Sequence, residues 1–152
     1  ALVKADLALS LAPAKPFPHH VRRVIDKFIR KGGHFIITTS EKSRFATKAF
    51  LSKYGIKISH QPLGAVKPEN NSEKLLMHNA NPLLLEDPND WKILCNAHTV
   101  YPVIAQRKID QGILTVIGDS GFLLNGRLEK NNWVHKSNIL FFKGLIEGEK
   151  GK

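Results

Sequence analysis

The chain has 152 residues, of which 23 are Lys or Arg and 13 are Asp or Glu, so its formal net charge at neutral pH is +10. This length suits one domain, and a composition with 42% hydrophobic and 24% charged residues is typical of a globular chain. One cysteine excludes an internal disulfide and a zinc site built on several thiolates, and no apolar run approaches the ~18 residues of a transmembrane helix.

The first third of the chain predicts a strand, a helix and a second strand. Aliphatic residues favour a buried strand at 6–12, which Pro13 follows. Gly32 then ends an amphipathic helix whose apolar residues recur with helical period at Val21, Val24, Ile25, Phe28 and Ile29. Residues 34–39 are β-branched and aromatic and predict a second buried strand.

The middle of the chain predicts a helix, a short strand and a long loop. Ser40 or Ser43 caps the helix, which ends at Gly55. The side chains expected to point inward from it are Phe45, Ala46, Ala49, Phe50 and Tyr54. A short strand follows at 56–58. Residues 61–72 are rich in Pro, Gly and Asn and predict a loop, 72–78 a turn or two of helix, and 82–85 an extended piece.

The last third predicts three strands at 91–95, 101–107 and 113–117, with the last two paired antiparallel across a tight turn. A final helix at 137–147 is anchored by Ile139, Leu140, Phe142, Leu145 and Ile146, and 148–152 is a frayed tail. Alternation of strands and helices favours parallel pairing. The sequence therefore predicts a single α/β domain over 1–147, a three-layer α/β/α sandwich on a mixed, mostly parallel sheet with a C-terminal antiparallel hairpin.

Polar residues follow the strands of this sheet and define a candidate ligand-binding site. Ligands of open α/β sheets bind outside the carboxyl ends of the strands, where Thr39, Ser40, Asp119 and Ser120 are expected to lie. A structural role for Asp119 is the alternative, because a loop after a strand needs acceptors for its free N–H groups. In that role its carboxylate is expected to bind backbone amides or side chains near the start of the last helix, around Asn125 or Asn138.

Two nucleophilic arrangements offer catalytic alternatives. Ser120 lies in Gly-Asp-Ser-Gly, a sequence also found around nucleophilic serines, and His135 or His98 would then be its base. Cys95 and His98 form a conceivable thiol–imidazole pair, against the alternative that Cys95 is a small buried apolar residue. The seven His show no metal-ligand spacing, and no phosphate-binding glycine loop is present, so neither a metal nor a cofactor is predicted.

The positive charge raises a nucleic-acid-binding module as a further alternative. Lys and Arg are spread along most of the chain, and the densest group occupies the solvated face of the first helix at Arg22, Arg23, Lys27, Arg30 and Lys31. Aromatic residues are not interleaved with these cations as base-stacking platforms would be. Solubility is the simpler interpretation of the charge.

The order of these pieces resembles a known family. The residues that carry the resemblance are Ala5–Leu9 with Ala12-Pro13, Val24–Gly33 with the strand after it, Tyr54-Gly55-Ile56, Asn81-Pro82-Leu83, Gly112–Phe122, Asn125 and Asn138. They are similar to the GIFT domain of intraflagellar transport proteins and to a domain of gliding-motility-type ABC transporter accessory proteins. Both have a flavodoxin-like fold similar to class I glutamine amidotransferases.

This resemblance implies a domain without amidotransferase activity. The amidotransferase nucleophile is a cysteine between glycines at the end of a central strand, and neither Thr38-Thr39-Ser40 nor Gly118-Asp119-Ser120 contains one. It implies structural roles for Gly32, Gly33, Gly118, Asn125 and Asn138, and binding of a protein subunit or a small polar ligand, a sugar among the candidates. It implies a cytoplasmic or periplasmic domain of a bacterial protein. The family usually has a strand and a helix before the piece that begins here, so an unpaired sheet edge and a homo-oligomer are expected.

Overall fold

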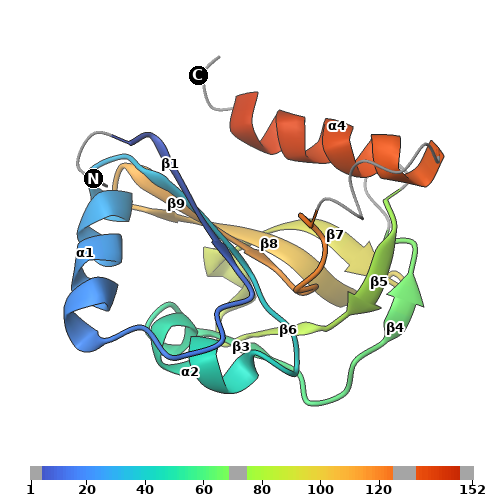
Figure 1. Cartoon of the computed structure of the whole chain (residues 1–152), viewed down its shortest axis with the longest axis horizontal. Coiled ribbons are helices and arrows are strands. Elements are labelled where there is room, and N and C mark those ends of the chain that lie inside the picture. The colour runs from blue at the N-terminus through green and yellow to red at the C-terminus, as the bar shows by residue number, and fades with distance from the viewer. Residues whose placement is uncertain (1–4, 69–74, 125–132, 148–152) are drawn as a thin grey trace.

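A five-stranded mixed sheet organises the molecule, which is a computed structural model that describes residues 5–68, 75–124 and 133–147 (Figure 1). Its strand order is β1-β2-β9-β8-β7, with bounds Leu7–Leu11, His34–Thr38, Gly112–Ile117, Tyr101–Ile109 and Lys92–Ala97. β1, β2 and β9 run parallel, while β8 and β7 are added antiparallel. The predicted mixed α/β fold and the parallel β1–β2 pair are confirmed. The sheet is not mostly parallel, because antiparallel pairings are as numerous as parallel ones.

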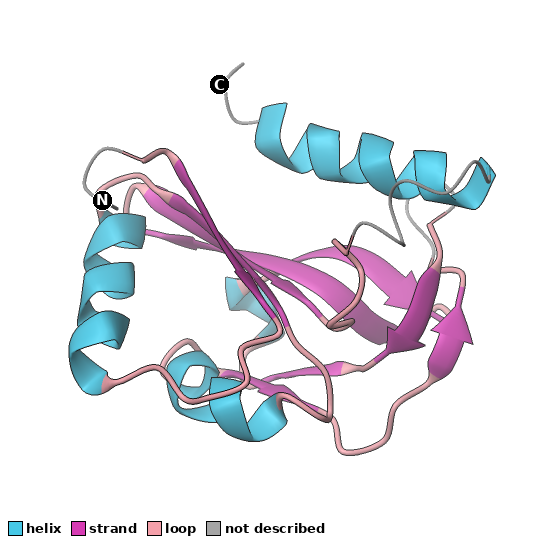
Figure 2. Cartoon of the chain, viewed as in Figure 1, coloured by secondary structure: helices cyan, strands magenta, loops and turns pink. Residues whose placement is uncertain are grey.

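Helices pack on both faces of this sheet, and Figure 2 shows α4 on the side opposite α1 and α2. α1 (His19–Arg30) and α2 (Arg44–Ser52) share a core with one face of β2 and β9, through Ile29, Phe50, Phe35 and Val116. The other face of the same strands packs against α4 (Trp133–Glu147), through Ile36, Ile117 and Phe141. Neighbouring residues of β2 thus enter different cores, because successive side chains of a strand point to opposite faces.

The predicted third strand does not join the central sheet. β3 (Ile56–Ile58) pairs antiparallel with β6 (Leu83–Leu85) in a separate two-stranded sheet. The place beside β2 that a parallel strand would take is occupied by β9, which arrives from much later in the chain. A short connection after β6 contains a turn of 3-10 helix at Pro88–Asp90.

The segment predicted as a loop and a short helix contains a second small antiparallel pair. β4 (Gly64–Val66) pairs with β5 (Met77–Ala80). The expected loop at 61–72 therefore includes a strand. The helical prediction for 72–78 is wrong at its end, since Met77 is fully buried opposite Val66, and its beginning lies outside the described residues.

The inward faces of the helices are narrower than predicted. Val24 is 48% exposed and Phe45 is 80% exposed, and Ala49, Ile139 and Leu140 are also exposed. α1 uses only Ile25, Phe28 and Ile29 as its buried contacts, because it packs on the sheet along one narrow stripe. Phe141, which the prediction passed over, is an apolar residue of α4 that is buried, as Leu145 is.

The end of α1 lies where the glycines predict it. α1 ends at Arg30, and Gly32 adopts a φ of +107°, in the left-handed region where a side chain is strained. A Cβ on Gly33 would meet the ring of Phe28. These two glycines therefore let the chain turn directly from α1 into β2.

A buried histidine makes folding sensitive to pH. His34 opens β2, is 2% exposed, and holds its Nε2 2.7 Å from the Thr115 hydroxyl. Burial lowers the pKa of His34 to about 4. In the unfolded chain the pKa of a histidine is ~6.5. Between these values the unfolded chain binds a proton that the folded protein does not bind. The free energy of unfolding is therefore greatest above the higher pKa and decreases as the pH falls toward the lower one.

His34→Gln is expected to flatten this pH dependence. The wild-type free energy of unfolding should fall by up to about 3 kcal/mol between these two pH values, which follows from about 1.4 kcal/mol per pKa unit. Urea unfolding at a series of pH values measures the effect. His98→Gln is the matched control, because it replaces an exposed histidine instead of a buried one. Equal slopes in all three proteins would show that His34 is not the group responsible.

Candidate functional site at the carboxyl edge of the sheet

Asn81, which is fully buried, ties three segments together at the carboxyl end of β9. Its backbone N–H donates to the Gly118 carbonyl oxygen at 2.6 Å, and its Nδ2 donates to that oxygen at 3.3 Å and to the Asn79 carbonyl oxygen at 2.6 Å. Its Oδ1 accepts from the Glu41 N–H at 3.0 Å, just before α2. We call this contact, with Gly118 and Asp119, the Asn81 junction.

Position 118 of this junction has to be a glycine, because there is no space for a side chain. A Cβ on Gly118 would meet the carbonyl oxygen of Asn81, and the Gly118 N–H donates to the Val103 carbonyl oxygen at 2.8 Å. No side chain fits between these backbones. Position 118 of the Gly-Asp-Ser-Gly sequence is therefore explained by packing.

Asp119 is 3% exposed and its carboxylate accepts three backbone N–H groups. Oδ2 accepts from His78 at 2.9 Å and from Asn79 at 3.1 Å, and Oδ1 accepts from Gly121 at 2.9 Å. The predicted binding of backbone amides is confirmed, but the partners lie on β5 and in the turn of Asp119 itself, not near the start of the last helix. The reason is that β5 passes directly beside the end of β9.

Asn138 has a different partner from the one predicted. Fully buried on α4, it donates from Nδ2 to the Leu76 carbonyl oxygen and accepts at Oδ1 from the Leu76 N–H, both at 3.0 Å. Its side-chain amide thus fixes α4 to the chain entering β5. Asn125 lies outside the described residues.

A depression opens where β1, β2 and β9 end. Ala12, Ser40 and Ser120 line it, together with Pro13, Ala14, Lys42, Ser43, Phe45 and Ala46. Ala12 adopts a φ of +44°, which strains a residue with a Cβ, and its N–H donates to the Thr38 hydroxyl at 3.0 Å. Thr38 in turn donates to the Ser120 carbonyl oxygen at 3.4 Å, so the three strand ends are held together.

Ser40 is the most unusual residue of the depression. It is fully buried, and within the described part of the chain its hydroxyl has no hydrogen-bond partner. Thr39 points elsewhere, since its hydroxyl lies 3.0 Å from that of Thr47 and 3.1 Å from that of Ser43. Of the four predicted ligand-binding residues, Ser40 and Ser120 line the depression. The side chain of Thr39 bonds to two hydroxyls at the start of α2, and that of Asp119 bonds to backbone N–H groups.

The structure brings no catalytic pair together among the residues it describes. No hydrogen bond joins the Ser120 hydroxyl to a histidine in these ranges, and the side chain of His135 lies outside them. Cys95 is 1% exposed in the core beside α4, as expected of a small buried apolar residue, whereas His98 is exposed in the turn between β7 and β8.

The described residues contain neither a metal-binding cluster nor a helix suited to crossing a membrane. Within residues 5–68, 75–124 and 133–147 there is no group of three or more His, Cys, Asp or Glu side chains placed to hold a metal ion. No helix in these ranges has the length and apolar character needed to cross a membrane.

The comparisons with known proteins show the fold alone. No family model and no curated protein matches the chain. Among solved structures, the N-terminal domain of mmIFT52 has a TM-score of 0.73 at 18% identity, over 96% of this chain and 77% of that one. A cytoplasmic protein of Salmonella typhimurium has a TM-score of 0.64 at 10% identity, over 93% and 72%.

A domain of larger enzymes also has this fold. An exo-β-1,4-mannosidase from an Opitutaceae bacterium has a TM-score of 0.67 at 7% identity, over 92% of this chain and 25% of the enzyme. This chain therefore matches only a quarter of the mannosidase. The class that the fold defines is a small α/β domain that occurs both in short chains and within longer ones.

Asp119→Ala is expected to lower the free energy of unfolding by more than ~2 kcal/mol, because it leaves three backbone N–H groups without their acceptor in a buried place. Thermal and urea unfolding measure the loss. Asp87→Ala is the control, since Asp87 accepts a single N–H, from Asn89, at an exposed site. Equal melting temperatures of Asp119→Ala and the wild type would contradict the structural role.

Proposed function

We propose that this chain is a non-catalytic domain that binds a small polar ligand in the depression at the carboxyl ends of β1, β2 and β9. The observation that carries the proposal is the buried Ser40 hydroxyl, which lacks a partner within the described residues. Such a group costs stability in the free protein, so a ligand atom that bonds to it is a physical reason for its presence.

The groups around Ser40 favour a ligand rich in hydrogen-bond acceptors. Lys42 supplies a cation, and α2 begins at the depression with its N-terminus, where the first N–H groups of a helix have no partner within the helix. Among the residues that the structure describes, no carboxylate lines the depression. Phe45, 80% exposed, offers a ring on which the face of a sugar could stack. A sugar fits these features.

Ser40→Ala gives the proposal a test with two opposite effects. The variant should be as stable as the wild type or more stable, by up to ~1 kcal/mol, because it removes a buried hydroxyl without a partner. It should weaken ligand binding, measured as NMR shifts of the Ser40, Phe45 and Ser120 amides on addition of galactose, mannose or inorganic phosphate.

Ser59→Ala is the matched control for this variant, because Ser59 does not line the depression and its hydroxyl bonds to Gln61 in its own turn. It should leave the shifts of the wild type intact. Two results would refute the proposal: a Ser40→Ala protein that is clearly less stable, which would give the hydroxyl a structural role, or wild-type protein whose depression responds to none of the three probes.

We also propose the finer architecture, a three-layer α/β/α sandwich with an antiparallel hairpin at the C-terminal side of the sheet, in a GIFT-type domain. Separate apolar cores on the two faces of the sheet support the layers, and the antiparallel β8–β9 pair, joined by Asp110 and Gln111, supports the hairpin. The family assignment rests on the sequence resemblance.

The free edge of β1 supports the proposal that the domain forms a homo-oligomer. Within the described residues β1 pairs with β2 alone, and Leu9 and Leu11 are 46% and 42% exposed. An apolar edge strand without Lys or Pro is a place where a second chain pairs. Light scattering over a concentration series should show a dimer that Leu9→Lys disrupts. A wild-type monomer at every concentration would refute it.

A further inference from the structure

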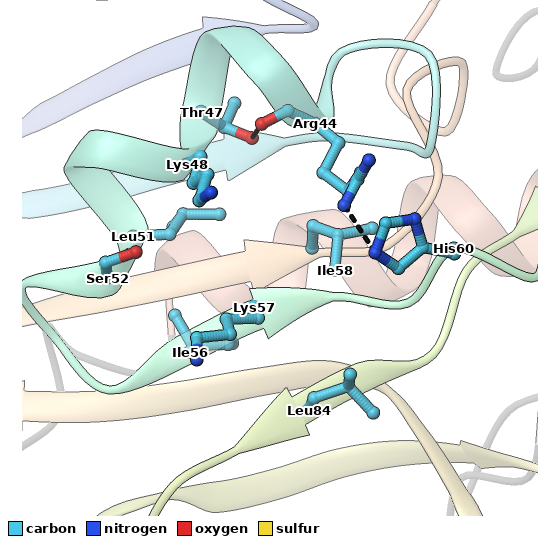
Figure 3. Close-up of a pocket in the computed structure, with 10 residues that line it drawn as sticks. All are labelled: Arg44, Thr47, Lys48, Leu51, Ser52, Ile56, Lys57, Ile58, His60 and Leu84. Carbon is cyan, nitrogen blue, oxygen red and sulfur yellow. Dashed lines mark hydrogen bonds between the residues drawn. The ribbon is translucent and has the colours of Figure 1, made fainter.

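A second concave site lies on the flank of α2, between this helix and the β3–β6 pair (Figure 3). Its floor is apolar: Leu51 of α2 and Ile56 and Ile58 of β3 are each no more than 3% exposed as residues. Leu84 of β6 stands at the mouth and is 50% exposed. The cavity measures about 90 Å³. We call it the α2 groove.

Cations surround this apolar floor. Arg44 and Lys48 are one helical turn apart on α2, and Lys57 comes from β3. Figure 3 shows Arg44 reaching from α2 toward His60, where its guanidinium donates to Nε2 at 2.6 Å. One of the five guanidinium N–H donors is used in this bond, so the others are available to a ligand.

The negative charge near the groove is small. None of the described residues that line it is a carboxylate. Glu86 lies beyond the rim, 3.9 Å from the Lys57 amine, and both of these side chains are well exposed, so water weakens their attraction. The cations at the Arg44 end have no acidic partner within the described residues. The groove therefore combines an apolar floor with a rim of net positive charge.

We propose that the α2 groove binds a small carboxylate with a branched aliphatic tail. The cavity is smaller than the ~150 Å³ site that takes up benzene in a protein core, which limits the buried part of the ligand to a branched chain of about four or five carbons. Arg44 binds the carboxylate, because a guanidinium matches the two carboxylate oxygens with two parallel N–H groups. The groove does not overlap the depression at the carboxyl edge, so this proposal does not depend on the proposed function.

Heteronuclear NMR titration with isocaproate tests the proposal, and isocaproamide is the neutral analogue of the same shape. Isocaproate should shift the amides of Leu51, Ile58 and Leu84, and isocaproamide should bind about tenfold more weakly or not at all, because the charge-assisted hydrogen bonds are lost. Acetate, which keeps the charge and lacks the tail, should also bind more weakly.

Two variants test the two ends of the ligand. Arg44→Gln should weaken isocaproate binding about tenfold, whereas Lys108→Gln, which removes an exposed cation that does not line the groove, should leave it unchanged. Leu84→Ser should weaken binding through the tail, and it should fold normally because this side chain is half exposed. Unshifted amides in the rest of the sheet serve as the check on folding.

Several outcomes would overturn the proposal. Equal affinity for isocaproate and isocaproamide would remove the role of the cations. An equal loss in Arg44→Gln and Lys108→Gln would reduce the effect to net charge. Shifts confined to Ser40, Phe45 and Ser120 would place the carboxylate in the depression instead, and the absence of shifts would exclude the groove as a binding site for this ligand class.

Discussion

The close contact between the backbones of Asn81 and Gly118 is the constraint on which the carboxyl edge of this protein depends. β9 ends there, and the carbonyl oxygen of Gly118 accepts both the N–H and the side-chain amide of Asn81. The side-chain oxygen of Asn81 accepts the N–H of Glu41, just before α2. One buried residue thus sets the distance between the central strand and the helix that borders the ligand-binding depression.

α2 is the element that both proposed sites share. Its N-terminus borders the depression and its flank forms one wall of the α2 groove. Phe50 fixes this helix to β2 through an edge-to-face contact with Phe35, and it makes similar contacts with Phe17 before α1 and Tyr54 after α2, at centroid distances of 5.2–5.7 Å. The Tyr54 hydroxyl donates to Asp26 of α1 at 2.8 Å, and burial with this carboxylate raises its pKa. A rigid α2 lets both sites keep their shape without a ligand.

Local patterns predicted the parts of the fold that depend on neighbours in the sequence. The spacing of Ile25, Phe28 and Ile29 predicted the helix that joins two parallel strands, and Gly32 predicted its end. The tight turn before Gly112 predicted the antiparallel β8–β9 pair. The pairing of β3 was not predictable in the same way, because it depends on β9 taking the place beside β2. Helix periodicity likewise did not show that Phe45 projects into solvent.

The sequence predicted where some residues of the candidate site lie, but not the contacts around them. The rule for the carboxyl ends of strands placed Ser40 and Ser120 at one edge of the sheet, and both line the depression there. The need for backbone acceptors predicted the backbone N–H contacts of Asp119. Asn81-Pro82-Leu83 carries part of the family resemblance, but the role of Asn81 was missed, because a buried asparagine that satisfies groups from three segments leaves no local pattern. The α2 groove was missed for the same reason, since β6 completes it from far along the chain.

A double-mutant cycle between Asn81→Ala and Asp119→Asn tests most directly whether the junction acts as one unit. The free energy of unfolding of the two single variants and the double variant is measured in urea. If both side chains hold the same contact between β9 and β5, the losses should be coupled by about 1 kcal/mol or more, since residues of one hydrogen-bond network are not independent. Losses that add within ~0.3 kcal/mol, as for independent sites, would contradict the account.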